Sequence, residues 1–550
     1  MRFDTIFVNG RFHTGLHSRN RVNAVGVHNG RIISLDDDIP TDRFRSVHDL
    51  HNAVVVPGFN DAHHHLVSVG LAMRQVDLRP SHAGSMDALL SAIAAASAHA
   101  DEHAWVIGAG YDQNYLGAHP TAEDLDRVAR GRPVYLVHAS RHMGVANTRA
   151  FELAGFPGRL GVPVPPGGAV PVDASGRAIG LLEETAKSIV TEHIPAANAD
   201  HVAEYVAAGS AAALAVGITS ITDPGLGAPD HLGISKYDIA GYQLARDRGQ
   251  LGVRATVMPY LTTLHRHDDV DTGGHPHYGL DHGVRSGWGD QWLRLGAVKV
   301  LSDGSLIGRS AYMREDYEAD ALAGCANHGY LQFPESELRE RLVGAHLAGW
   351  QLAVHAIGDA ALDVAIDIVE EAQRIQPRSD ARHRIEHVCM ASDAQLARMR
   401  SVGLLAIPQG RFVYELGDGV LRALGTGRSR LAYRMKALLD AGLKVAASTD
   451  APVVSANPLL NIHDMVNRRT AGGAAFNPEE RITVQQAIRA YTAGSAYASH
   501  QENEKGCITT GMLADFVVLS QDLFGIPAEE IAGTTVTATV VGGGLAYGDL

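Results

Sequence analysis

Short apolar segments alternate with helical patterns through the middle of this chain of 550 residues. Eight of these segments are predicted to be strands: 54–56, 219–222, 253–257, 295–300, 351–355, 384–387, 404–407 and 444–448. Helical patterns, such as the one at 336–343, lie between them. This alternation is typical of a parallel α/β sheet, and eight strands fit a (β/α)8 barrel, also called a TIM barrel.

Both ends of the chain are predicted to be small β structures. Residues 24–33 form a hairpin pattern with Asn29-Gly30 at its tip, a strong signal for a tight turn. Segments 514–519 and 536–541 are predicted strands, followed by a glycine turn at 542–544. We expect residues 1–56 and 500–550 to pair into one small sheet domain, and the barrel to occupy 57–499.

One connection in this scheme is far too long. The first and second predicted strands lie roughly 150 residues apart, whereas a βα unit needs about 30. The segment from about 70 to 195 is therefore predicted to be an insertion near the active-site face. We interpret it as a cap over the pocket.

Composition excludes several classes of function. A net charge of −14 argues against a nucleic-acid-binding protein, which needs a basic face. Three distant cysteines, Cys325, Cys389 and Cys507, suit reduced thiols rather than a disulfide framework. The N-terminus has no apolar segment typical of a signal peptide, and no apolar run reaches the ~18 residues of a membrane span. We therefore expect a cytoplasmic protein without a membrane partner.

Several histidines lie where strands are predicted to end. His63 and His65 are two residues apart, so on a strand they point the same way and could chelate one metal ion. Neutral imidazole suits zinc and other divalent first-row metals. The alternative is a turn that happens to be rich in histidine. His355 and His387 end two successive strands; either one alone is more often structural, but together they favour a second ligand pair.

Lys299 and Asp450 are the other candidate site residues. Lys299 lies in an apolar strand, where an unpaired charge is costly. It either reaches solvent, pairs with Asp303, or adds CO₂ to become an anionic carbamate that could bridge two metal ions. Asp450 could bind metal and accept a proton, or could simply cap a turn.

Three further residues are weaker candidates for contact with substrate. His142 lies in the predicted insertion, and Arg309 and Tyr312 follow the fourth predicted strand. Each of the three is also explained by loop packing or a position on the surface.

Six motifs, taken in order, resemble the amidohydrolase superfamily and specifically its YtcJ-like branch, which includes N-substituted formamide deformylases. These motifs are 57–65 (PGFNDAHHH), 298–305 (VKVLSDGS), 355–359 (HAIGD), 384–387 (RIEH), 448–452 (STDAP) and 511–518 (GMLADFVV). Each motif is weak alone, but the ordered set covers nearly the whole chain. One departure is His64, where smaller residues are usual. A shift of the register by one residue would make His64 a rival ligand.

The resemblance implies a (β/α)8 barrel with a β-sandwich built from both termini. It also implies two divalent metal ions, with zinc the expected metal. In this assignment His63 and His65 bind one ion and His355 and His387 the other. Lys299 bridges the ions as a carboxylated lysine, and Asp450 binds metal and moves a proton. His142 matches a histidine that faces substrate in the branch.

The activity implied by the resemblance is hydrolysis, by metal-activated water, of a non-peptide C–N bond in a small molecule such as an N-substituted formamide. An esterase, lactonase or deaminase on the same scaffold is the alternative, because a fold does not determine the bond that is cleaved. A catalytically inactive scaffold protein is a further alternative. The resemblance also suggests a homodimer.

Overall fold

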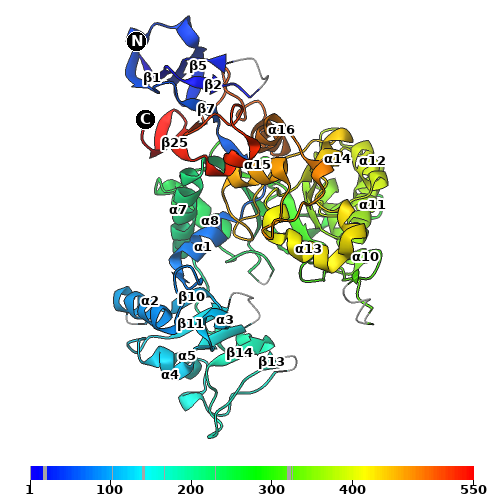
Figure 1. The fold of residues 1–550 in the computed structure, drawn as a ribbon. Helices are drawn as coiled ribbons and strands as arrows, with labels where there is room; N and C mark the ends of the chain where they lie inside the picture. Colours follow the sequence, from blue (N-terminus) through cyan, green and yellow to red (C-terminus); the bar gives the residue numbers. More distant parts are fainter. Residues whose placement is uncertain are drawn as a thin grey trace. The chain divides into compact units, whose positions relative to one another are not determined.

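The computed structural model describes residues 2–15, 21–101, 103–138, 143–165, 168–229, 231–318, 324 and 326–550. The chain divides into two compact units. One consists of Met1–Val69 with Asn198–Leu550, and the other of Gly70–Ala197 (Figure 1).

Two four-stranded parallel sheets form the centre of the larger unit. The first has the order β19-β16-β15-β8, with strands β8 (Phe59–Asp61), β15 (Ile218–Leu226), β16 (Arg254–Pro259) and β19 (Leu293–Leu295). The second has the order β20-β21-β22-β23, with strands β20 (Val298–Leu301), β21 (Leu352–Ala356), β22 (Arg384–His387) and β23 (Leu405–Ile407).

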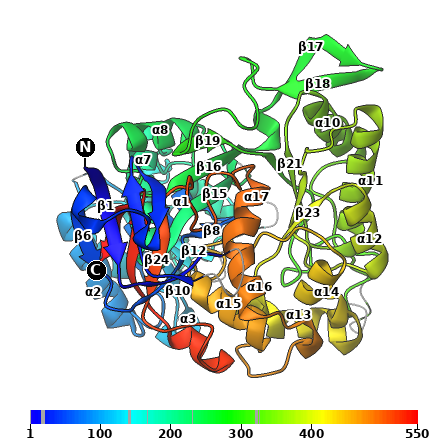
Figure 2. The ribbon, with the colours of Figure 1, turned by 90° about the horizontal axis from the view of Figure 1, so that it is seen from above.

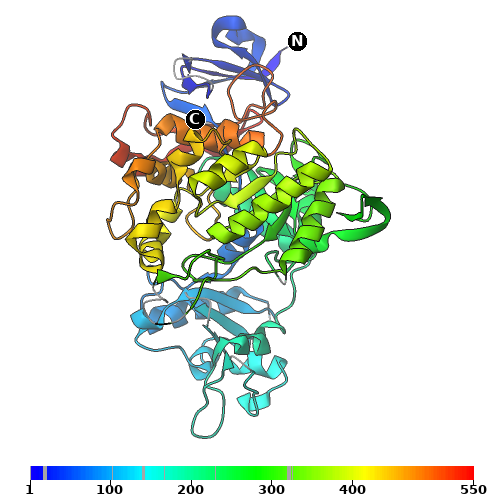
Figure 3. The same ribbon diagram turned by 90° about the vertical axis from the view of Figure 1, so that its right-hand side faces the viewer.

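Helices follow these strands as an α/β alternation requires. They include α7 (Ala199–Ala215), α8 (Asp238–Asp247), α10 (Glu335–Leu347), α11 (Asp359–Ile375), α12 (Asp393–Ser401), α13 (Phe412–Arg428), α15 (Pro458–Asn467) and α16 (Val484–Arg489). Helices α10, α11 and α12 lie side by side along the second sheet (Figures 2 and 3). Helix α11 shows why: Leu362, Ile366 and Val369 recur at helical spacing and are buried, so one apolar face packs inward.

Isolated parallel contacts connect the two sheets at both ends. Tyr260, just after β16, bridges to Lys299 of β20, and Ala406 of β23 bridges to Val445. On the far side, Ala62 N–H donates to the Ala447 carbonyl at 3.2 Å. The segment from 445 therefore lies between β23 and the end of β8.

Two predicted barrel strands differ from the observed ones. The segment 295–300 is divided between β19 and β20. Its backbone is pressed against β16 at Gly296, where a Cβ would lie 2.6 Å from Thr256 Cγ2. The segment 444–448 makes isolated bridges instead of a continuous ladder. Among the described residues, the parallel strands thus form two sheets and not one continuous eight-stranded sheet.

The prediction that 54–56 is the first parallel strand is wrong. Strand β7 (Val54–Pro57) pairs antiparallel with β24 (Phe516–Leu519) in a different sheet. The chain changes partners at Gly58, whose N–H donates to Asp515, whereas the next N–H, of Phe59, donates to Gly217. Only glycine fits at position 58, because any side chain there would collide with Thr219. The first strand of the two parallel sheets is therefore β8.

Strands from both ends of the chain share a six-stranded sheet of order β26-β25-β24-β7-β2-β3. A four-stranded sheet of order β5-β4-β1-β6 faces it. The remaining strands of these sheets are β1 (Phe3–Val8), β2 (Arg11–His13), β3 (Arg21–Val22), β4 (Val25–His28), β5 (Arg31–Leu35), β6 (Phe44–Asp49), β25 (Val536–Val541) and β26 (Gly544–Gly548). Phe7 and Val27 of one sheet and Phe516 and Val540 of the other belong to one buried core. The predicted hairpin at 24–33 is confirmed as β4–β5.

The smaller unit has its own sheet and core. Its sheet order is β13-β14-β12-β11-β10-β9, with β9 (Val76–Asp77), β10 (Val106–Tyr111), β11 (Val134–His138), β12 (Met143–Ala146), β13 (Gly168–Ala169) and β14 (Leu181–Glu184). Helix α2 (Met86–His99) buries Leu89 and Ile93 against this sheet. The role of this segment as a cap stays a prediction.

Two other expectations concern cysteines and membranes. Cys389 and Cys507 are buried and free, while Cys325 lies outside the described residues. No described helix combines the length and apolar composition that crossing a membrane requires.

Candidate active site

One cavity of about 300 Å³ in the larger unit brings together six predicted residues from distant parts of the sequence. Its polar lining includes His63, His65, Lys299, His355, His387 and Asp450. His63 and His65 follow β8, His355 and His387 lie near or at the ends of β21 and β22, and Asp450 follows the segment that bridges to β23. Lys299 lies within β20. Because the strands are parallel, their carboxyl ends meet at the same side of the sheets.

His63 is held by a buried carboxylate. Its Nδ1 pairs with Glu386, and Arg384 donates to the same carboxylate from Nη2 at 2.9 Å. Both His63 and Glu386 are almost completely buried. An Nδ1–H that donates to Glu386 leaves Nε2 with a free lone pair, and this Nε2 lies 3.4 Å from Asp450 Oδ1. Such a carboxylate–histidine pair is the arrangement that orients a metal-binding imidazole.

Two other imidazoles are oriented in the same way. The Nδ1 of His387 lies 2.9 Å from Gln409 Oε1, so it donates there and leaves Nε2 as the free acceptor. The Nε2 of His355 lies 3.1 Å from the carbonyl oxygen of Gly304, so it donates there and leaves Nδ1 free. Each ring therefore has one nitrogen fixed by the protein and one available to a ligand.

The four histidine rings form a continuous group. Ring centroids are 5.3 Å apart for His63 and His65, 4.9 Å for His63 and His387, and 4.6 Å for His387 and His355. Burial, reinforced by the charge of Lys299, holds the pKa of His63 well below its usual range. Burial and the neighbouring His355 do the same to the pKa of His387. Both rings are therefore neutral near pH 7, which is the form that binds metal.

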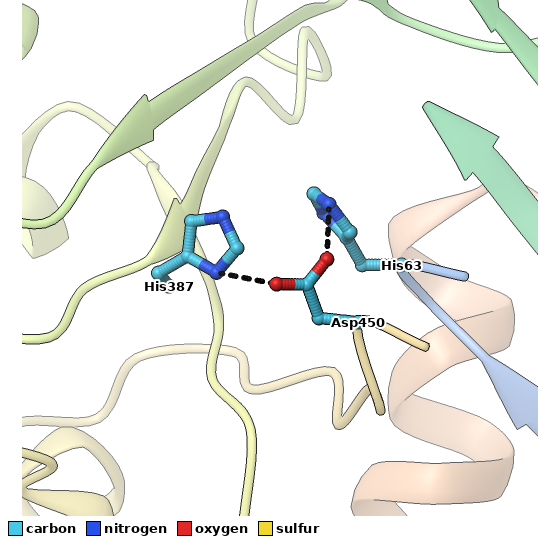
Figure 4. Close-up of side chains that lie close together, drawn as sticks. All are labelled: His63, His387 and Asp450. Atoms are coloured by element: carbon cyan, nitrogen blue, oxygen red, sulfur yellow. Dashed lines mark ion pairs between the residues drawn. The ribbon is translucent and has the colours of Figure 1, made fainter. Parts of the chain in front are cut away.

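Asp450 lies between the histidines. Its Oδ1 is 3.1 Å from His65 Nε2, and its Oδ2 is 3.9 Å from His387 Nδ1. His63, His387 and Asp450 each place one potential ligand atom within 4.8 Å of the others (Figure 4). Figure 4 shows the carboxylate pointing between the two rings.

Lys299 is completely buried, and its Nζ has no hydrogen-bond partner among the described residues. Burial lowers the pKa of Lys299 to about 8, although Glu386 and Asp450 oppose this effect. The alternative pairing with Asp303 is not observed. The Asp303 carboxylate instead accepts the backbone N–H groups of Ile357 and Gly358, at 3.1 and 2.8 Å.

His64 points away from this cavity. Its Nδ1 lies 3.1 Å from Asp61 and 3.2 Å from Thr449. Asp61 also accepts the backbone N–H of Thr449 at 3.0 Å, which fastens the end of β8 to the segment before Asp450. His64 therefore helps to connect β8 to the segment before Asp450 and does not line the cavity.

The contact between Glu386 and His63 is not predicted by the pattern of residues along the strand. Alternation along a strand predicts that Glu386 points away if His387 points in. Glu386 does not line the cavity, yet its carboxylate reaches His63. The φ of His387 is 75°, so the regular strand ends there. The alternation of side chains therefore no longer applies strictly to Glu386 and His387. Arg384, two residues before Glu386, was the available signal, because a buried Arg needs a carboxylate.

The structure gives no cavity contact to two of the three substrate candidates, Arg309 and Tyr312. Arg309 is exposed, and Tyr312 is half-buried with its N–H donated to Asp303 at 3.0 Å. Neither residue is among the described residues that line the cavity. His142 lies outside the described residues. Contact of these three with substrate stays a prediction.

Comparison with known proteins identifies the family. The model of a family described as the amidohydrolase family matches residues 46–547. YtcJ of Bacillus subtilis (strain 168) is 29% identical over 90% of each chain, and the N-substituted formamide deformylase of Arthrobacter pascens is 29% identical over 91% of this chain and 89% of its own.

A solved structure agrees with these matches. The crystal structure of an uncharacterized metal-dependent hydrolase from Pyrococcus horikoshii OT3 covers 95% of this chain and 99% of its own. It aligns with a TM-score of 0.76 at 23% identity, so the two proteins share a fold. The resemblance drawn from the six motifs is confirmed, and the chain belongs to the amidohydrolase family.

Proposed function

We propose that this protein is a metal-dependent hydrolase that cleaves a non-peptide C–N bond in a small molecule, with an N-substituted formamide as the first substrate to test. The observation that carries this proposal is the meeting of four imidazoles, one carboxylate and one amine without a hydrogen-bond partner in a single buried cavity. The similarity to the formamide deformylase supports the choice of substrate.

The donor set fits two divalent ions. His63 and His65 would hold one ion, His355 and His387 the other, and Asp450 would contribute an oxygen. Imidazole nitrogens with a carboxylate are typical of zinc sites. Buried imidazoles with one nitrogen already fixed by Glu386, Gln409 or Gly304 are ready to bind.

Lys299 fits the role of a bridge after carboxylation. Its amine is buried without a hydrogen-bond partner in the described part of the chain, and the pKa of about 8 gives a fraction of neutral amine near pH 7. A neutral amine adds to CO₂ and releases one proton, which yields an anionic carbamate. The carbamate would replace a costly buried cation with two oxygen ligands in the same place.

The contacts between the two parallel sheets support a closed barrel. Tyr260 bridges to Lys299 on one side, and the segment at 445–450 lies between β23 and β8 on the other. If β19 and β20 are counted as one divided strand, the strands of these sheets and the segment at 445–450 make eight parallel segments. In this order they would complete a (β/α)8 barrel, whose active sites lie at the carboxyl ends of the strands.

Asp450 is the residue that would move protons in this proposal. Bound divalent ions would polarise the substrate carbonyl and make water a nucleophile near neutral pH. As water adds to the carbonyl carbon, Asp450 accepts its proton and then returns it to the leaving nitrogen. The C–N bond breaks as the nitrogen is protonated, so the products are a carboxylic acid and an amine.

The test combines metal content with a substrate panel. We expect about two ions per chain, by elemental mass spectrometry, in protein purified without chelator. The panel contains formamides, other amides, esters, lactones and aminated heterocycles. Preference for formamides or other amides supports the proposal, whereas preference for esters, lactones or heterocyclic amines assigns the alternative reactions. An absence of metal together with no activity after addition of metal would favour the inactive scaffold.

A further inference from the structure

The cavity lining contains two chemically different groups of side chains. One group is the proposed ligands, and the other, here called the apolar end, includes Leu232, Leu306, Ile307, Phe412, Leu416 and Val453. These apolar residues come from separate segments of the chain, so no single helix or strand makes this part of the lining apolar. The cavity volume of about 300 Å³ is at the small end for ligand sites in proteins. This size suits a single ring or a short chain.

Helix α13 supplies a flat wall beside the ligands. The ring of Phe412, its first residue, lies nearly parallel to the His387 ring, with 6.0 Å between centroids and 11° between planes. Leu416 follows one turn later, and residues four apart share a helix face. The wall therefore begins next to the proposed metal ligands and continues away from them.

A second wall comes from the segment after β20. Leu306 is buried, and Ile307 packs close to α13, since a Cβ at Gly419 would lie 3.3 Å from Ile307 Cγ1. Ile307 and Val453 are 46% and 55% exposed. These two side chains therefore form an apolar rim on the cavity.

The apolar end offers no counter-charge. Among the described residues that line the cavity, the only ionisable groups besides those of Cys389 and Tyr433 are those of the proposed ligands. Arg411, adjacent to Phe412, is already paired with Glu415 at 2.8 Å and Asp464 at 2.9 Å. A charged substituent on the substrate would lose its hydration here and gain no partner, which is costly.

We propose that the apolar end of this cavity, formed by Leu306, Ile307, Phe412 and Leu416, selects substrates whose substituent on the scissile group is uncharged and apolar. This inference rests on the proposed function for the identity of the scissile group. Leu416 is the residue best placed to set the specificity, because it follows Phe412 along the wall.

A matched pair of compounds tests the selection. N-(3-methylbutyl)formamide and N-formyl-β-alanine have nearly the same shape, but a branched alkyl end in the first is a carboxylate in the second. We expect kcat/KM to be higher for the alkyl compound by at least about tenfold, comparable to the discrimination that apolar pockets achieve. Equal values, or a preference for the carboxylate, would overturn the inference.

Binding to a metal-loaded Asp450→Asn variant keeps this test independent of turnover. Tighter binding of the alkyl compound, measured by calorimetry, supports the inference even if the wild type hydrolyses neither compound, and in that case only the proposed function fails. Failure of the alkyl compound to bind overturns the inference.

Two variants at position 416 complete the design. Leu416→Lys is expected to reverse the preference of the wild type, while Leu416→Met preserves it. A Leu416→Lys variant that retains the wild-type preference counts against the assigned wall.

Discussion

Lys505 offers a quantitative test of the packing between the parallel strands and the C-terminal strands. Its side chain is buried, with 4% of the residue exposed, and its Nζ donates to Ser220 of β15. Burial lowers the pKa of Lys505 to about 7 from 10.5, and the nearby Arg254 acts in the same direction. Keeping Lys505 charged in this buried site therefore lowers the free energy of unfolding, and Lys505→Met should remove this destabilisation.

The magnitude follows from the two pKa values. The difference between 10.5 and about 7, at about 1.36 kcal/mol for each pKa unit, corresponds to roughly 5 kcal/mol below pH 7. Loss of the hydrogen bond to Ser220 offsets about 1 kcal/mol of this gain. We therefore expect Lys505→Met to increase the free energy of unfolding at pH 6 by about 3 kcal/mol, with some allowance for imperfect packing of the methionine.

The pH dependence has a defined sign. Between pH 7 and 10.5 the unfolded chain binds more protons at Lys505 than the folded chain, so the wild type gains stability as the pH rises. The variant lacks this gain. The stability difference between variant and wild type should be largest below pH 7 and should shrink towards pH 10.5.

Urea unfolding of both proteins, followed by intrinsic fluorescence at pH 6, 8 and 10, measures this difference. Lys236→Met, at an exposed lysine, is the matched control, and we expect it to change stability by no more than about 0.5 kcal/mol. A Lys505→Met protein that is less stable than the wild type at pH 6, or a difference that does not change with pH, would refute the reasoning.

Three further predictions concern the candidate site. Glu386→Gln should weaken metal binding about 10- to 100-fold, because the carboxylate that orients His63 is lost. The metal retained after dialysis against a competing chelator measures this effect, and retention equal to that of the wild type would contradict it. Asp450→Asn should lower kcat by about 10²- to 10⁴-fold with the fold intact, as measured by steady-state kinetics and circular dichroism, and near-normal turnover would exclude Asp450 as the proton carrier. His63→Asn should reduce metal content while His64→Asn should not, because only His63 lines the cavity; elemental analysis of both variants decides, and equal loss of metal would show that the histidine assignment is wrong.

Much of the site could be predicted because its information is local. A histidine, lysine or aspartate at the end of an apolar strand is visible in the sequence, and parallel strands bring their carboxyl ends together. Six such residues accordingly line one cavity, and the hairpin at Asn29-Gly30 follows from the backbone preferences of those two residues.

The strand assignments show where local information ends. Segments 54–56 and 59–61 are both short and buried, and only the partners of Gly58 and Phe59 assign them to different sheets. The division of 295–300 depends on how closely the backbone at Gly296 approaches Thr256. Neither effect appears in apolar periodicity, because that pattern reports burial and not which strand lies alongside.

The sequence by itself determined the family and the types and order of the candidate ligands along the chain, since these depend on residue identity and spacing. The tertiary structure decided which nitrogen is free in His63, His355 and His387, that the carboxylate paired with His63 is Glu386, and that apolar side chains from α13 and the segment after β20 complete the cavity. These features arise from contacts between residues that lie from 22 to 323 positions apart in the sequence. Only the packing of the chain determines such contacts, because burial, hydrogen bonding and charge at each group depend on neighbours that the local sequence does not contain.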